Sequence, residues 1–426
     1  MIHLFTLILL LPVILPDGVA QIAPVERVFN VEQSIFYALR NRKDILLVSK
    51  DLEIARERIK EAGSFKYPKI DLTFNYSDVS TDRFTSLPPA FGSILIPRRT
   101  PGPYYTTRLS LWQNVYAGGL YSSNIQFAKS NIIRAENQVK VVTNDVVFAV
   151  KKSFYELIAT RELIALYEIF ISSAQGIIKS GTFKSIDEEL QADTLLAEIN
   201  DKYNRMKTNF EKQKLDFLNT LGLELDTNFK IEGSFDSEIE SYDINKLLAW
   251  AFEYRPEPKQ IQAQEEIDAL SMKLSLSARY PTVALGAHYE FPGEKFAFDN
   301  KNWNATISLN LPIFDGWASW SRIRQKRLQL EQNKLKKKEL EDSIRLEVRK
   351  SYSEYNYLLD DLKEKQQRTQ KAEEFTLKLQ QASVLEGLKI LRYWLNAKTE
   401  YVTALKEYNK AKAAVEHAVG KTLVKE

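Results

Sequence analysis

Four short segments of the chain alternate between apolar and polar residues, which is the pattern of a β-strand with one apolar and one polar face. The apolar positions of the first segment are Ile70, Leu72, Phe74 and Tyr76, and those of the third are Val283, Leu285, Ala287 and Tyr289. The apolar positions of the second are Leu109 and Leu111, and those of the fourth are Trp303, Ala305, Ile307, Leu309 and Leu311. We therefore predict strands at about 69–77, 104–113, 282–291 and 302–311.

Two long stretches of the chain contain no proline, one between Pro103 and Pro256 and one after Pro312. Both are rich in Glu, Lys, Leu, Ala and Gln, which favour helices, and they lack the residue that breaks helix interiors. The predicted helices span about 121–179, 186–221, 317–385 and 389–419. A helix of about 60 residues is about 90 Å long, a length typical of coiled coils or helical tubes. Within any single turn the apolar spacing also fits an ordinary amphipathic core helix, and only the length favours the rods.

These elements occur twice in the same order, because the chain contains an internal repeat at fixed offsets. The matched pairs are Arg42 with Arg255, Asp44 with Glu257, Tyr67-Pro68 with Tyr280-Pro281, Leu109-Ser110-Leu111 with Ile307-Ser308-Leu309, Val115-Tyr116-Ala117-Gly118 with Ile313-Phe314-Asp315-Gly316, and Leu221-Gly222 with Val419-Gly420. We predict a first structural repeat over 24–229 and a second over 230–426. Each runs helix, strand, loop, strand, long helix, turn and shorter helix.

The strands have the length and the alternation of transmembrane β-strands, which carry about ten residues each. Aromatic residues near their ends fit interface girdles, namely Tyr67, Tyr76, Trp112, Tyr289 and Trp303. Taken alone, the strands fit a small soluble four-stranded sheet with one wet face equally well. Each strand, however, adjoins a helical segment, so we expect the strands and the rods to stack end to end.

Four strands cannot close a barrel in lipid, because about eight is the smallest number that does so. An open edge in lipid would leave backbone groups unsatisfied at a cost of several kcal/mol each. We therefore expect the strands of several subunits to combine, and three copies would give a barrel of twelve strands.

Composition and charge exclude several classes of function. The formal net charge of the 426 residues is +3, which does not suggest nucleic-acid binding. The absence of cysteine excludes disulfides, thiolate metal ligands, thiol nucleophiles and a lipid-modified N-terminal cysteine. Only His288 and His417 follow the first 20 residues, without partners at metal-ligand spacing, and no glycine-rich phosphate loop is present. We predict no catalytic, cofactor-binding or metal site, so the protein is not expected to be an enzyme.

The N-terminal 20 residues are expected to form a signal peptide. An apolar stretch from Ile8 to Leu15, interrupted by Pro12, is followed by small residues. An ordinary buried N-terminal segment is the alternative. No apolar run of 18 residues or more follows residue 23, so we expect no transmembrane helix after it.

The duplicated plan resembles the TolC-type outer-membrane efflux and secretion channel family, also known as outer membrane factors. The resemblance covers about 30–423 and rests on Tyr67-Pro68, Tyr280-Pro281, the strand-to-helix turns at 111–119 and 309–317, and Ala418-Val419-Gly420. It implies a mainly α fold with membrane β, in which a homotrimer builds a 12-stranded outer-membrane β-barrel continued by a long periplasmic α-helical coiled-coil barrel. It further implies a passive exit duct of a tripartite efflux pump or a type I secretion system.

The resemblance implies the partners as well, which are outer-membrane lipid, a periplasmic adaptor (membrane fusion) protein and an inner-membrane pump. Two rival functions remain on the sequence alone. A periplasmic coiled-coil adaptor would have long helices without membrane strands, and a structural envelope protein would have no pore. The duplicated order of strands and helices favours the channel.

The family closes its duct at a periplasmic tip, which the resemblance places at the turns around 179–187 and 385–392. The candidate tip residues are Gly181, Asp187, Glu188, Glu386, Gly387, Tyr393 and Asn396. Tyr393 and Asn396 stand where some members carry a pair of pore-facing aspartates. The acids of 187–189 either supply a cation-attracting ring instead or are solvated residues favoured by the helix dipole. The basic run from Arg322 to Lys338 either faces an anionic partner or is a solvated helix face.

Overall fold

The computed structural model describes residues 27–79, 102–235, 241–379 and 382–422, so the predicted signal peptide lies outside the described residues. The first repeat contains β1 (Arg27–Phe29), α1 (Val31–Asn41), α2 (Lys43–Ser64), β2 (Lys69–Val79), β3 (Gly102–Ala117), α3 (Leu120–Ser180) and α4 (Ile186–Leu221). Next come β4 (Phe229–Ile231), α5 (Ile244–Tyr254), α6 (Glu257–Ser277), β5 (Thr282–Gly293), β6 (Asn302–Asn310), α7 (Ala318–Thr376) and α8 (Val384–Val419). The duplicated strand-helix plan expected from the sequence is confirmed.

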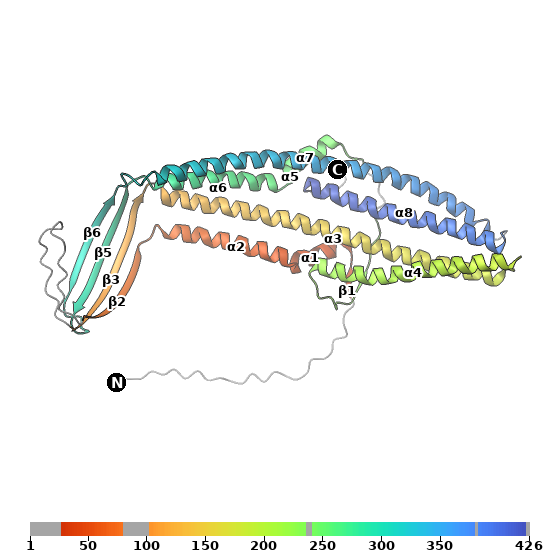
Figure 1. The fold of residues 1–426 in the computed structure, drawn as a ribbon, viewed down its shortest axis with the longest axis horizontal. Coiled ribbons are helices and arrows are strands. Elements are labelled where there is room, and N and C mark those ends of the chain that lie inside the picture. The colour runs from red at the N-terminus through yellow and green to blue at the C-terminus, as the bar shows by residue number, and fades with distance from the viewer. Residues whose placement is uncertain (1–26, 80–101, 236–240, 380–381, 423–426) are drawn as a thin grey trace, which may run out of the picture.

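The helices form a long wall with the strands at one end (Figure 1). The rods α3 and α7 run along the whole wall. In the half near the strands, α2 packs on α3, and α6 fills the space between α3 and α7. In the other half, α4 takes the place of α2 and α8 that of α6. The wall is therefore four helices wide over most of its length, with α7 at one edge and α2 followed by α4 at the other.

The four longer strands form one antiparallel sheet in the order β2-β3-β5-β6. The two repeats meet in this sheet where β3 pairs with β5. The strands β2 and β6 each have one neighbour, so both edges of the described sheet are open. The strands β2, β3 and β5 extend to or beyond their predicted ends, and β6 stops one residue short of its predicted end. A separate parallel pair, β1 with β4, lies beside the middle of the wall.

Two apolar clusters hold the wall together. The larger surrounds the middle of the wall and includes Phe154 of α3, Tyr355 of α7 and Tyr408 of α8, each almost fully buried. The hydroxyls of Tyr355 and Tyr408 lie 3.0 Å apart, which gives each buried oxygen a hydrogen-bonding partner. The smaller cluster lies at the end away from the sheet and includes Phe170 of α3 and Leu388 of α8.

The helix ends follow the sequence closely except at one turn. The helix predicted at 186–221 coincides with α4, and the one at 121–179 differs from α3 by one residue at each end. The prediction of a single helix over 317–385 is wrong, because α7 ends at Thr376. The turn expected at 385–392 is wrong as well, since these residues lie inside α8.

A capping box explains where α8 begins. The side chain of Glu386 accepts hydrogen bonds from the backbone nitrogen of Ser383 at 3.0 Å and from its hydroxyl at 2.8 Å. Gly387, a candidate residue of the predicted tip turn, lies within the first turn of the helix that this box starts. The Ser-x-x-Glu signature was therefore the better indicator of the helix start.

An apolar sheet face and a helical tip as candidate functional sites

The apolar residues of all four strands lie on one face of the sheet. One row of directly paired residues runs from Leu72 to Leu109, Tyr289 and Trp303. Directly opposite residues in antiparallel strands project to the same face, so this row and the alternate rows beside it are contiguous. Leu72 is 73% exposed, Trp303 75% and Ile307 77%, so within the described chain most of this face is uncovered. Phe296 packs against Phe74 and Tyr105 at the end away from the helices.

The other face of the sheet is polar. Arg108 and Glu290 are paired across β3 and β5, and Arg108 Nη2 donates to Glu290 Oε2 at 2.7 Å. Trp112 pairs with Lys69 and Gly286 and belongs to this same face. A Cβ atom at Gly286 would lie 2.7 Å from the Trp112 ring, so the glycine makes room for the indole. Trp112 is therefore not a girdle residue of the apolar face, and that prediction is wrong.

The tip of the wall is formed where the α3–α4 turn meets the α7–α8 turn. Gly181 ends α3, and a Cβ atom there would overlap the side chain of Val384, the first residue of α8. Gly387 lies one turn further along α8, where an added Cβ atom would be 3.3 Å from Ile177 of α3. The two glycines are not equivalent positions of the repeat, yet both allow α3 and α8 to approach closely at the tip.

Two of the candidate carboxylates serve as helix caps. Glu188 accepts from the backbone nitrogen of Lys184 at 2.9 Å, and its own nitrogen donates to Ser185 Oγ at 3.2 Å. Glu386 caps the start of α8 in the same way. The hydrogen bond from the Ser383 backbone is the main reason why the pKa of Glu386 is lowered. These carboxylates hold the first turns of α4 and α8.

The remaining candidates are exposed side chains. Asp187 accepts from Gln191 at 2.8 Å within α4. Tyr393 and Asn396 lie on one face of α8, and the Tyr393 ring is 5.9 Å from that of Phe375 on α7. The structure thus places Asp187 on one helical pair of the tip and Tyr393 with Asn396 on the other.

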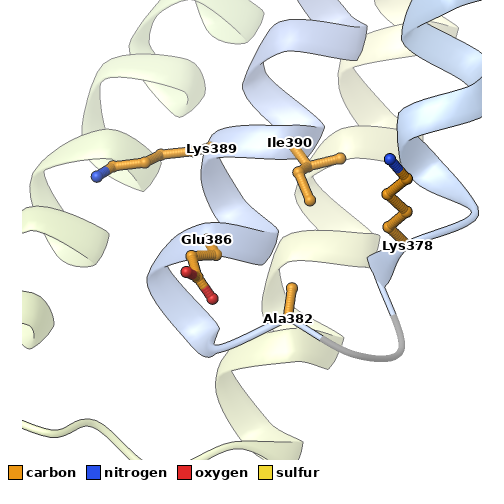
Figure 2. A pocket seen from close by; sticks show the side chains of 5 residues that line it. All are labelled: Lys378, Ala382, Glu386, Lys389 and Ile390. Atoms are coloured by element: carbon orange, nitrogen blue, oxygen red, sulfur yellow. The ribbon is translucent and has the colours of Figure 1, made fainter.

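A shallow hollow of about 410 Å³ lies where α7 leads into α8. Its lining includes Lys378, Glu386 and Lys389, and in Figure 2 the amine of Lys389 lies at the left and that of Lys378 at the right, with Ile390 between them. The two cations do not converge on a joint anion site. Across the described ranges, no helix combines the length and apolar character needed to cross a membrane, and no three His, Cys, Asp or Glu gather as metal ligands.

Residues 251–420, most of the second repeat, match the model of the family described as outer membrane efflux protein. The second repeat thus matches the outer membrane efflux protein family. Comparison of the chain with curated protein sequences gives no match.

Solved structures resemble this chain over nearly its whole length. The outer membrane protein VceC of Vibrio cholerae is 16% identical, with a TM-score of 0.72 over 92% of this chain and 96% of that one. The CmeC outer membrane channel of Campylobacter jejuni is 17% identical, with a TM-score of 0.72 over 92% and 85%. The MtrE outer membrane channel of Neisseria gonorrhoeae, in its open state, is 14% identical, with a TM-score of 0.73 over 92% and 89%. At these identities the likeness is one of fold.

An ion network that the sequence did not reveal joins four helices of this chain. Arg255, which is 7% exposed, donates to Glu347 of α7 at 2.6 Å and to Glu257 of α6 at 2.6 Å. His417 of α8 lies with Nδ1 3.5 Å from Glu347 and with Nε2 2.8 Å from Asp145 of α3. The hydrogen bond with Glu347 is the main cause that raises the pKa of His417, and the same bond leads the contacts that lower the pKa of Glu347 to about 2.

We expect this network to make the stability of the protein depend on pH. The raised pKa of His417 contributes stability that is complete below 6.5 and is lost as the pH rises through the raised value. The lowered pKa of Glu347 contributes stability that is present above 4.5 and is lost as the pH falls toward about 2.

His417→Asn introduces the residue type found at the matching position of the first repeat, Asn219. We expect it to lower the free energy of unfolding near pH 6 by about 1.5 kcal/mol and to flatten the decline in stability above that pH. Thermal unfolding of the detergent-extracted protein at a series of pH values measures this, and parallel curves for the two proteins would contradict it.

Proposed function

We propose that three copies of this chain form a passive exit duct in the outer membrane, continued through the periplasm as a helical tube. The duct serves a tripartite efflux pump or a type I secretion system. The observation that carries this proposal is the four-stranded sheet, whose apolar face is uncovered and whose two edges are open, at one end of a rod-like wall. The polar face, with Arg108 and Glu290, would line the water-filled interior.

The open edges require neighbours. In lipid, the outward N–H and C=O groups of β2 and β6 would lack partners at a cost of several kcal/mol each. Pairing of β6 of one copy with β2 of the next satisfies both edges and closes a barrel. Twelve strands from three copies lie within the range of known single barrels.

The helical wall supports the same arrangement. Its two edges expose apolar residues in the half near the sheet, Leu328, Leu335 and Leu346 on α7 and Leu46, Leu47 and Ile54 on α2. When copies meet around an axis, α7 of one copy comes beside α2 of the next, and these residues become buried between them. Coiled-coil walls are built from such seams.

The end of the wall away from the sheet is proposed as the periplasmic tip that closes the duct and meets the adaptor. Asp187, Tyr393 and Asn396 are the exposed candidates for lining the opening, while Glu188 and Glu386 hold the helix starts. Opening would be a shift of rigid helices with no chemical step. The energy would come from an inner-membrane pump, which the adaptor links to the duct. An adaptor or a poreless spacer is less well supported, because neither explains an uncovered apolar sheet face.

The mass of the detergent-extracted protein, measured by light scattering with correction for bound detergent, tests this proposal. We expect a trimer from the outer-membrane fraction that conducts ions when inserted in a planar bilayer. Asp187→Ala would then lower the preference for cations if this carboxylate lines the opening. A monomer that stays in solution without detergent would overturn the duct, because four strands alone cannot satisfy their edges in lipid.

A further inference from the structure

The basic run noted in the sequence begins where the sheet passes into the wall. Residues 322–338 of α7 contain eight Lys or Arg against one acid, Glu331. The matching residues of the first repeat, 124–140, contain three Lys or Arg against one acid, Glu136. Both segments lie in long helices that follow a sheet strand, so the fold alone does not require the extra charge.

The start of α7 also presents two exposed tryptophans. Trp317 is 67% exposed, and among the described residues it is the one non-glycine residue with a positive φ, 69°. Its counterpart in the first repeat is Gly119, with φ 80°, at the same left-handed position. A residue with a Cβ atom is disfavoured there, so a tryptophan held in this conformation points to a function outside the fold. Trp320, also exposed, replaces Ser122 of the first repeat.

Cations and aromatic rings share one side of this region. Trp320, Arg324 and Arg327 follow each other at four and three residues and therefore form one stripe of α7. The guanidinium carbon of Arg279, just beyond the end of α6, lies 4.2 Å from the centre of the Trp320 ring. Arg279, Arg324 and Arg327 are all exposed. We call these residues, together with Trp317, the interfacial cluster.

The interfacial cluster lies close to the level at which the apolar sheet face ends. Counting 1.5 Å per residue from the start of α7, Arg324 lies about 9 Å and Arg327 about 14 Å along the helix. These distances are within about two Debye lengths of the sheet end at physiological salt. Tryptophan prefers the headgroup level of a bilayer, and clustered cations next to a membrane attract anionic lipids.

We propose that the interfacial cluster binds anionic phospholipid headgroups in the periplasmic leaflet of the outer membrane. The proposal rests on the proposed function, because it needs the sheet to lie in that membrane. It deepens that function, since a strip of bound headgroups around the neck would fix the depth of the duct in the bilayer. Charge complementarity and the position of the cluster next to the end of the sheet point to a lipid as the occupant.

Spin-labelled lipids provide the test. The full-length trimer is reconstituted in phosphatidylcholine vesicles that carry a trace of spin-labelled phosphatidylglycerol or spin-labelled phosphatidylcholine, and the motionally restricted fraction gives the relative association constant of the two lipids. Each cation near the surface is worth about a fivefold gain, so Arg324→Gln with Arg327→Gln should reduce the preference for phosphatidylglycerol by about tenfold or more. Added salt should weaken the preference of the wild type.

A matched control comes from the same stripe. Lys334→Gln with Lys338→Gln removes the same charge about 24 to 30 Å from the start of α7, beyond the reach of the headgroups, and should leave the preference unchanged. A further variant, Trp317→Gly with Trp320→Ser, restores the first-repeat residues and should reduce the restricted fraction of both lipids.

The outcomes separate the inference from the function on which it rests. The lipid site would be overturned if the double arginine variant and the double lysine variant changed the lipid preference equally, or if neither changed it, while the trimer still inserts and conducts. A change in the anion selectivity of conductance without a change in lipid preference would place the cluster inside the duct and would also overturn it. Failure of the wild type to insert as a trimer would instead overturn the proposed duct. Size-exclusion mass and helix content by circular dichroism confirm that each variant is folded.

Discussion

Ile307→Arg should nearly abolish the trimer in the outer-membrane fraction, whereas Thr306→Arg should leave most of it in place. Ile307 is 77% exposed near the middle of β6, and it pairs with Leu285 on the apolar face. An arginine there would face the lipid near the middle of the bilayer at a cost of about 2–4 kcal/mol per protomer. Thr306 pairs with Gly286 on the opposite, polar face, where an arginine stays in water.

Quantitative detection of the trimer in washed outer membranes, after equal expression, measures this difference. The neighbouring position is the control, because the two variants carry the same charge at almost the same height. Equal loss for both would show that the strand tolerates no arginine at all, and equal retention would contradict a lipid-facing apolar sheet.

The second large effect is expected from Arg255→Ala. Arg255 donates to two carboxylates and to the carbonyl oxygen of Ala418 at 3.1 Å, and a Cβ atom at Gly420 would lie 3.1 Å from its Cα. Removal of the guanidinium leaves the partly buried Glu347 with His417 as its remaining partner, and breaking such a buried ion pair costs about 3–5 kcal/mol. We expect this decrease in the free energy of unfolding of the helical part.

The repeat supplies the control for this prediction. Arg42 is the counterpart of Arg255, its side chain is 28% exposed, and its ion pair is with Asp44 at 2.9 Å. Arg42→Ala should therefore cost about 1 kcal/mol or less. Urea denaturation of the detergent-extracted protein, followed by circular dichroism, compares the two. Similar losses would mean that the network around Arg255 adds nothing to what the repeat already provides.

Sequence periodicity predicted most of this architecture because the periods are long and uninterrupted. The alternating residues from Ile70 to Tyr76 lie within β2, and the proline-free stretch after Pro103 contains α3 and α4. The second tip turn was predicted at 385–392 from the family resemblance, whereas the capping signature of Ser383 and Glu386 starts α8 ahead of these residues. A glycine alone fits a helix interior at modest cost, whereas a Ser-x-x-Glu pair satisfies two backbone donors at once.

Contacts between segments that are distant in the chain could not be predicted from the sequence. The network of Arg255, Glu347 and His417 joins positions that are far apart in the chain, and no local pattern marks them as neighbours. Trp112 was predicted as a girdle residue because it is aromatic and lies near a strand end, although its alternation with Leu109 and Leu111 already places it on the polar face. The sequence does not show that its neighbour across the sheet, Gly286, makes room for the indole.

The order β2-β3-β5-β6 affects assembly because the number of strands in the sheet is even. Every neighbouring pair in the sheet is antiparallel, so β2 runs away from the helices and β6 returns toward them. An even number of strands brings opposite directions to the two edges, and β6 therefore meets the β2 of any identical neighbour in the antiparallel sense. Rings of three, four or five copies would all satisfy the strands equally. The directions of the strands thus favour a closed ring but do not fix the number of subunits in it. We expect the width and curvature of the helical walls to decide that number.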